Sequence, residues 1–232
     1  MDWRIGRLGD QALLLRLGER IDAATNARVH ALARRIAVQR PAWMRDVVPA
    51  YASLAVFVDA ERLGGAGDPL AVAARELQPL LDEHDDTADA NGGIVEIPVR
   101  YGGEDGPDLQ RVADHAGLSA ADVITQHAAV EYTVAMLGFA PGFPYLLGLD
   151  PRLATPRLST PRTRVPAGSV AIGGAQAGLY PRPGPGGWNL IGRTGAVLFD
   201  PARDPPALLA PGARVRFLAE RARKMKEGGE AR

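Results

Sequence analysis

The chain has 232 residues, of which 46% are hydrophobic and 23% charged, and its formal net charge is zero. These proportions exclude a disordered or collagen-like chain. Without cysteine there is no disulfide, thiolate metal site or cysteine nucleophile, and the balanced charge argues against a nucleic-acid-binding protein. The N-terminus does not resemble a signal peptide and no apolar run reaches about 18 residues, so we expect a cytoplasmic protein with no membrane partner.

Residues 1–88 predict a small N-terminal α+β domain. Four apolar runs predict strands, at residues 3–8, 12–17, 47–48 and 54–58. Asp22 can cap a helix that runs to about Gln39, and Asp68-Pro69 can open a second helix that ends near Leu81. The order ββαββα favours an antiparallel sheet with helices on one face, and an acidic linker follows at about 84–93.

Residues 94–220 predict a second domain, a closed or nearly closed β-barrel. Roughly one residue in three between 139 and 199 is Gly or Pro, well above average usage. Short apolar runs between these turns predict strands, at 94–100, 132–138, 169–172, 190–191, 196–199 and 214–218. Two helices are predicted, at 107–116 and from Ser119, with Asp122 in a weak capping box, to about Ala129. Residues 221–232 are predicted to be a charged tail.

Common catalytic signatures are missing from the sequence. There is no G-x-S-x-G elbow, HExxH motif, phosphate-binding P-loop or GxGxxG fingerprint. The four histidines are too scattered to predict a local metal pair, so no metal site is expected. A hydrolase that works alone is therefore not supported.

Arginines gather where turns are dense. Residues 139–199 hold six Arg and no Lys, with Asp150 as the one acid. Arg162 lies in a Thr-Pro-Arg triplet and Arg193 in a Gly-rich segment, and rigid neighbours reduce the entropy lost when a guanidinium binds an anion. We predict that both side chains face one electropositive pocket that binds a small anionic substrate. The alternative is that they are ordinary solvated surface arginines.

Three further groups of residues are candidates for the same pocket. A rigid loop at 138–146 carries aromatic side chains, and a glycine segment at 184–194 can expose backbone N–H groups beside a tryptophan. The predicted substrate contacts are Phe139, Phe143, Tyr145, Ser169, Gly186, Gly187 and Trp188. His127 and Tyr132 are predicted acid, base or substrate-donor groups that act with Arg162 and Arg193. Packing within the barrel, or helix capping by His127, is the alternative for each group.

Four long motifs resemble the signatures of a known family, the 5-oxoprolinase B-subunit family. They are GFAPGFPYL at 138–146, TPRTRVPAGSVAIGG at 160–174, GLYP at 178–181 and PGGWNLIGRT at 185–194. The family is also known as allophanate hydrolase subunit 1, as a carboxyltransferase domain subunit, and as the kinase-autophosphorylation inhibitor of sporulation, KipI. Small departures, with Pro183-Gly184 before PGGW and Gly195 after Thr194, affect loop shape and substrate choice more than fold.

The resemblance implies an α+β N-terminal domain and a cyclophilin-like β-barrel. It also implies two partners, a C-type subunit with a related cyclophilin-like barrel and an A-type subunit. With these, the family opens 5-oxo-L-proline to L-glutamate using ATP and Mg²⁺ bound by the complex. No tightly bound cofactor is expected in this chain. Two alternatives stay open: a non-enzymatic inhibitor of a sensor histidine kinase, and a subunit of an allophanate hydrolase or urea carboxylase-type carboxyltransferase.

Overall fold

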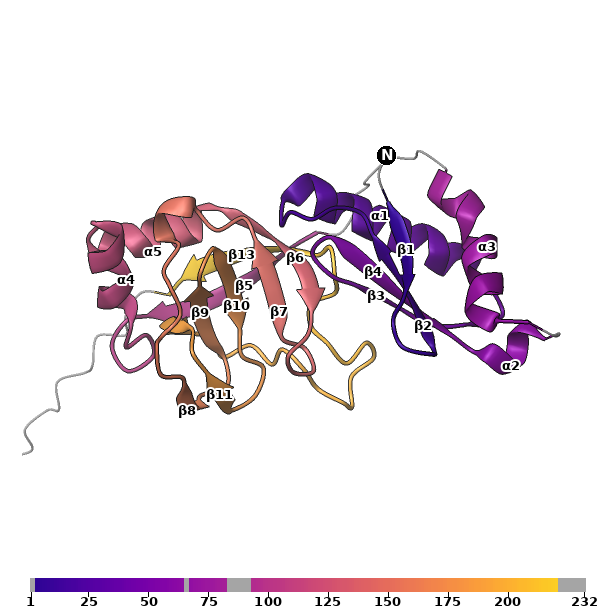
Figure 1. Ribbon diagram of the computed structural model, residues 1–232. Helices are drawn as coiled ribbons and strands as arrows, with labels where there is room; N and C mark the ends of the chain where they lie inside the picture. The colour runs from indigo at the N-terminus through magenta and orange to yellow at the C-terminus, as the bar shows by residue number, and fades with distance from the viewer. Residues whose placement is uncertain (1–2, 65–66, 83–92, 221–232) are drawn as a thin grey trace, which may run out of the picture. The chain divides into compact units, whose positions relative to one another are not determined.

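The computed structural model describes residues 3–64, 67–82 and 93–220 (Figure 1). Within them the N-terminal part forms a four-stranded sheet in the order β1-β2-β4-β3. Its strands are antiparallel and comprise β1 (Arg4–Arg7), β2 (Ala12–Arg16), β3 (Met44–Pro49) and β4 (Ser53–Val58). The helices of this part are α1 (Ala23–Gln39), α2 (Ala60–Leu63) and α3 (Pro69–Asp82).

One face of this sheet is covered by α1 and α3. Alternate residues of β2 and β4, such as Leu15 and Val56, are fully buried against apolar residues of the two helices. The same alternation places Arg4 and Arg16 on the opposite face, because successive side chains of a strand point to opposite sides. Asp22 caps α1 through a 2.8 Å hydrogen bond from the Thr25 amide, so the predicted helix start is confirmed.

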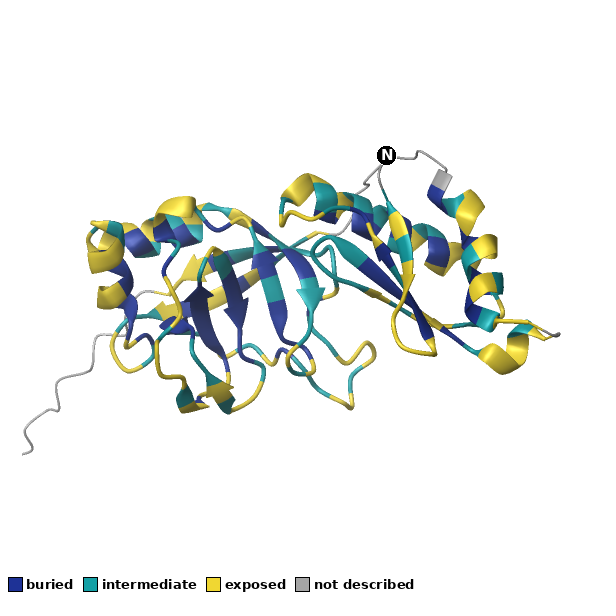
Figure 2. Ribbon diagram, in the orientation of Figure 1, coloured by how far each residue is buried: buried dark blue, intermediate teal, exposed yellow. Residues whose placement is uncertain are grey.

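The remaining strands form a closed barrel in the order β10-β7-β6-β13-β5-β12-β9. Its strands are β5 (Ile94–Tyr101), β6 (Glu131–Leu137), β7 (Pro144–Leu147), β9 (Ser169–Gly173), β10 (Gln176–Leu179), β12 (Asn189–Arg193) and β13 (Arg214–Ala219). A separate two-stranded sheet pairs β8 (Arg162–Val165) with β11 (Gly184–Gly186). Strands β9 and β10 are buried along most of their length (Figure 2).

Two helices lie between β5 and β6 in the sequence, namely α4 (Leu109–Ala116) and α5 (Ala120–Ala129). A short 3-10 helix, η1, spans Pro151–Leu153. Helix α5 begins with the predicted capping box, in which Ser119 and Asp122 exchange side-chain-to-backbone bonds. Helix α4 packs against α5 and β12, which brings the loop before α4 to the end of β12.

The α+β class with a barrel is confirmed, and several strand predictions are refined. The run 196–199 is not a strand, since Phe199 makes only an isolated bridge with Ala207. Strands β7, β8, β10 and β11 were not predicted. All strands of the four-stranded sheet precede residue 88 and all barrel strands follow residue 93, while the domain boundaries themselves stay a prediction. The linker at 84–93 lies outside the described residues but for Gly93, and the tail lies outside them entirely.

Chain contacts group the residues into two compact units that are not continuous in sequence. One contains residues 1–95, 132–148 and 198–215, and the other contains 96–131, 149–197 and 216–232. In the described part of the chain, no helix combines the length and apolar character that crossing a membrane requires.

Candidate functional site

Both predicted catalytic arginines bind acids of the loop between β5 and α4. Arg162, at the start of β8, donates from Nη2 to Asp108 Oδ1 at 2.7 Å. Arg193, at the end of β12, pairs with Asp105. Asp105 and Asp108 are three residues apart, so the structure brings the two guanidiniums to one loop although 31 positions separate them in sequence. They are therefore neither isolated from each other nor free of counter-ions.

The loop from Tyr101 to Asp108 is held by backbone contacts with β12. The amide of Gly102 donates to Ile191 O at 3.0 Å, and that of Asp108 donates to Leu190 O at 2.9 Å. A Cβ on Gly106 would lie 2.1 Å from Ile191 O, so any larger residue there would push the loop off the strand. This close approach fixes the loop and the two carboxylates that it carries.

Asp108 is the most enclosed acid of the cluster, with 8% of its surface exposed. Its Oδ2 accepts from the Leu190 amide at 2.7 Å while its Oδ1 accepts from Arg162. Arg162 Nη1 is also buried, and within the described residues it has no hydrogen-bond partner. A buried donor without a partner is uncommon. Asp108 fixes the orientation of this guanidinium, and 30% of the Arg162 side chain remains exposed.

Asp105 lies between two arginines. Burial alone would raise the pKa of Asp105, but hydrogen bonds from Arg100 and Arg193 outweigh it and hold that pKa below its ordinary value. The Arg100 Nε–Asp105 Oδ2 distance is 2.8 Å. Asp105 therefore stays ionised at neutral pH and positions the Arg193 guanidinium.

Asn189 is a buried polar residue of this cluster that the sequence analysis did not single out. It is fully buried in β12, and its amide nitrogen donates to the carbonyls of Pro156 and Ile172, both at 3.0 Å. Its Oδ1 accepts from Arg111 Nε of α4 at 3.0 Å. The residue was visible in the PGGWNL motif, but nothing in the sequence alone indicates that its amide joins β12 to α4.

His127, on α5, packs against residues of the barrel strands β5 and β13 and has no exposed surface. Its Nδ1 lies 2.7 Å from the Tyr101 hydroxyl, and its ring stacks on Phe217 with centroids 4.7 Å apart. Burial lowers the pKa of His127 from 6.5 to about 3, so the ring is neutral at pH 7. Tyr132, in β6, is also fully buried. This burial favours the packing alternative for both residues, and their roles in proton transfer stay predictions.

The aromatic loop presents one exposed ring above buried ones. Phe139 is 63% exposed and has a left-handed φ of 65°, which is uncommon for a bulky residue. Its ring meets that of Phe143 edge-on, with the ring centroids 5.4 Å apart, and the centroids of the Phe143 and Tyr145 rings are 4.9 Å apart. Phe143 is 2% exposed, so of these two phenylalanines it is Phe139 that could reach a ligand or partner in this chain.

In the predicted glycine segment, the Trp188 ring packs against Gly173 of β9 and Gly186 packs against Tyr180. A Cβ on Gly173 would lie 2.4 Å from the Trp188 ring, and one on Gly186 would lie 2.3 Å from the Tyr180 hydroxyl. Trp188 is 6% exposed, with the Arg157 guanidinium 5.5 Å from its ring centre. This packing is what a tryptophan that fills the barrel would show, while the predicted contacts of Gly186 and Gly187 with substrate remain untested.

Ser169 begins β9 directly opposite Arg193 and is 1% exposed. The structure therefore places Ser169 next to one of the predicted arginines, with little surface to offer a substrate. No group of three or more His, Asp or Glu side chains within residues 3–64, 67–82 and 93–220 is arranged to hold a metal ion.

Comparison with known proteins identifies the family. A model of the carboxyltransferase domain, subdomain C and D, matches residues 3–209. The 5-oxoprolinase B subunit of Bacillus subtilis (strain 168) is 45% identical over 221 residues, covering 93% of this chain and 92% of that protein. That of Escherichia coli O157:H7 is 44% identical and covers 92% and 94%. The chain belongs to the 5-oxoprolinase B-subunit family.

Solved structures carry the same fold. The crystal structure of TTHA0988 superposes with a TM-score of 0.78 at 42% identity over 91% of this chain, which spans 40% of that longer chain. The protein PH0987 from Pyrococcus horikoshii is also 42% identical, with a TM-score of 0.55 and coverage of 94% and 97%. The Kluyveromyces lactis urea carboxylase, at 21% identity and a TM-score of 0.69, shows the fold alone.

Membership of the family confirms the resemblance, and the structure adds the acids that the motifs omit. The family motifs contain both Arg162 and Arg193 but neither Asp105 nor Asp108. The signal that could have found them is local: a Gly-Gly-x-x-Gly run with acids among the glycines, between a strand and a helix, marks a loop built around close backbone approach.

Proposed function

We propose that this chain is the B subunit of an ATP-dependent 5-oxoprolinase, which opens 5-oxo-L-proline to L-glutamate together with a C-type and an A-type subunit. One observation carries the proposal: two bacterial 5-oxoprolinase B subunits match it at 44–45% identity along nearly the full length of both chains. Such coverage includes the N-terminal sheet and the barrel alike, so the likeness extends beyond a shared barrel.

The arginine cluster suits the chemistry of this reaction. An amide in a five-membered ring is a poor electrophile, and phosphoryl transfer from ATP to its carbonyl oxygen activates the carbonyl carbon for attack by water. Collapse of the tetrahedral adduct breaks the ring C–N bond, with the nitrogen leaving as the amine, and hydrolysis of the acyl phosphate then releases phosphate. The route produces a carboxylate and a phosphate. Arg162 and Arg193, whose side chains are 30% and 33% exposed, are the groups we assign to hold these anions.

Asp108 and Asp105 act as positioning residues in this proposal. Asp108 binds Arg162, and Asp105 binds Arg193 as well as Arg100, so each carboxylate limits the orientations that its guanidinium partner can take. A charge oriented before the substrate arrives needs little reorganisation during the reaction. The remaining machinery, ATP and Mg²⁺ included, is assigned to the assembled complex.

The test is reconstitution. This chain should be produced with its neighbouring C-type and A-type proteins, and glutamate formation from 5-oxoproline should be measured with and without ATP. The complex should form glutamate only with ATP, and this chain alone should form none. A complete complex that makes no glutamate, or a single chain that turns over robustly, would contradict the proposal.

The family model favours a second candidate, because it describes a carboxyltransferase domain. In that case the complex would move a carboxyl group from carboxybiotin to an amide-type acceptor. Supplying urea and a carrier whose biotin already bears a labelled carboxyl group separates the candidates, since transfer of that carboxyl group to urea without glutamate formation would favour the carboxyltransferase. A sensor kinase encoded beside this chain, in place of an A-type protein, would instead favour the kinase inhibitor.

A further inference from the structure

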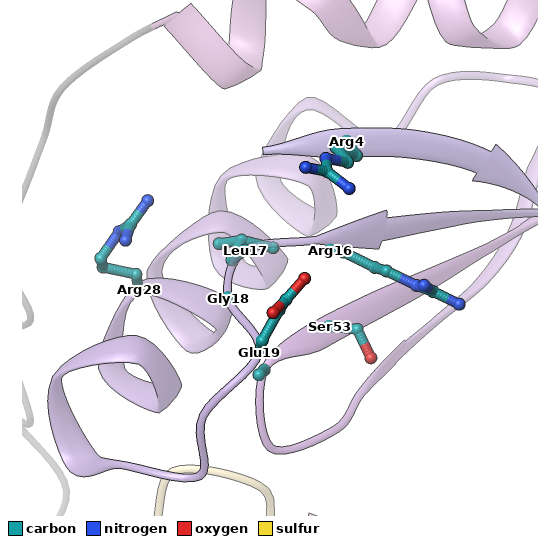
Figure 3. A pocket seen from close by; sticks show the side chains of 8 residues that line it. Arg4, Arg16, Leu17, Gly18, Glu19, Arg28 and Ser53 are labelled. Carbon is teal, nitrogen blue, oxygen red and sulfur yellow. The ribbon is translucent and has the colours of Figure 1, made fainter. Parts of the chain in front are cut away.

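A cavity of about 720 Å³ opens beside the N-terminal sheet, where β2 ends (Figure 3). Its volume falls within the range of small-molecule sites, which is about 300–1,000 Å³. Its lining comes from β1, the end of β2 and the turn after it, α1, and the start of β4. The polar side chains that line it are Arg4, Arg16, Glu19, Arg28 and Ser53.

Two of these arginines are direct neighbours across the sheet. Arg4 of β1 lies opposite Arg16 of β2, and Arg16 lies opposite Ser53 of β4. Like charges directly opposite each other in an antiparallel pair destabilise the sheet. Both side chains are exposed, so solvent reduces this repulsion without abolishing it.

The positive charge of the cavity is not neutralised. In the parts of the chain that the structure describes, Arg4, Arg16 and Arg28 form no ion pair, whereas Arg7 of the same strand pairs with Asp68. Glu19 is the one acid in the lining, and it too forms no ion pair there. In Figure 3 its carboxylate lies between Arg28 and Arg16, with Arg4 above. Three arginines and one glutamate give a net charge of +2.

We propose that this cavity binds a phosphorylated small molecule that carries two or more phosphate groups and a hydroxyl or amino group. Arginine side chains from three separate elements, β1, β2 and α1, line the cavity. A diphosphate offers acceptor oxygens on all sides, whereas a planar carboxylate is matched by a single guanidinium fork. Glu19 can accept a hydrogen bond only, so the ligand needs a donor to face it. The site is independent of the proposed 5-oxoprolinase activity, because none of its residues belongs to the arginine–aspartate cluster.

In the experiment, the full chain is titrated at low ionic strength with pyrophosphate, ADP, ATP or citrate, and binding is measured by calorimetry. Pyrophosphate and the nucleotides should bind, and citrate should bind at least tenfold more weakly. Arg4→Gln, Arg16→Gln and Arg28→Gln should each weaken binding about tenfold or more. Arg45→Gln is the matched control, an exposed arginine of β3 in the same sheet but outside the cavity, and it should leave binding unchanged.

Two further measurements separate binding from folding. Arg16→Gln removes the cross-strand repulsion, so its melting temperature should stay equal or rise while its affinity falls. Glu19→Gln removes the one negative charge and should strengthen pyrophosphate binding, an effect that a damaged fold cannot produce. No binding of pyrophosphate at millimolar concentration, equal losses in Arg45→Gln, or citrate affinity equal to that of pyrophosphate would each overturn the proposal.

Discussion

The buried histidine of the barrel makes a quantitative prediction about acid sensitivity. His127 has a pKa of about 3 in the folded protein, against 6.5 for an exposed histidine. As the pH falls below 6.5, the unfolded chain takes up a proton at this position and the folded chain does not. Folding therefore loses stability between pH 6.5 and about 3, by roughly 1.4 kcal/mol for each pH unit.

Between pH 7.5 and pH 5 this linkage removes about 2 kcal/mol, because only the 1.5 units below 6.5 contribute. The figure does not depend on the exact folded pKa, provided that it lies well below 5. His30 has a pKa lowered chiefly by burial and adds to the loss, so the effect of His127 must be isolated by substitution.

The assay is urea unfolding of the wild type, His127→Gln and His115→Gln at both pH values. At pH 7.5, His127→Gln should be less stable than the wild type, because the contact between the Tyr101 hydroxyl and the ring is lost. Between pH 7.5 and pH 5, however, its free energy of unfolding should fall by about 2 kcal/mol less than that of the wild type. His115, exposed on α4, is the matched control and should keep the wild-type pH dependence. Equal pH dependence in wild type and His127→Gln would refute the reasoning.

Three other substitutions test the cluster and the barrel. Asp108→Asn should lower the free energy of unfolding in urea titrations by about 1.5–3 kcal/mol, because a buried ionic hydrogen bond is lost. The control is Asp114→Asn, at an exposed position of α4, which should change that free energy by less than about 0.5 kcal/mol. Gly173→Ala should cost about 1–3 kcal/mol in the same assay through its clash with the tryptophan ring, and Gly184→Ala, where a Cβ meets no atom within 4 Å, should not. Arg162→Lys should lower kcat/KM of the assembled complex about ten- to a hundredfold, because the two-pronged guanidinium is replaced by a point charge. Arg164→Lys, on the same strand, is the control. An unchanged kcat/KM in Arg162→Lys would favour the alternative that Arg162 is an ordinary surface arginine.

Local signals in the sequence were sufficient for the longer helices α1, α3, α4 and α5, whereas the short helices α2 and η1 were not predicted. Asp22 begins α1 and Ser119 begins α5 because each side chain accepts a backbone N–H that the first helical turn leaves unpaired. Such interactions span only three residues, so they can be recognised without knowledge of the fold.

Short strands within the turn-rich region could not be predicted in the same way. Strand β10 has only four residues, Gln176–Leu179, and is defined by its pairing with β9 rather than by its own alternation. The apolar run 196–199 looked equally strand-like, but in the structure it contributes only an isolated β-bridge, between Phe199 and Ala207. Long-range pairing decides between these cases, and neither segment carries that information in its own residues.

The charge of the candidate site also could not be predicted from the local sequence. The count of acids within residues 139–199 predicted unneutralised arginines, yet Asp105 and Asp108 reach them from a loop more than thirty positions earlier. The glycines of that loop explain how: backbone contact with β12 carries the two carboxylates to the arginine-bearing segments. Because both acids are already engaged, an anion that binds there gains little from net positive charge. It gains instead from donors that are fixed in place, which is why the proposed site depends on the Arg162 guanidinium, whose orientation Asp108 fixes and whose side chain keeps 30% of its surface exposed.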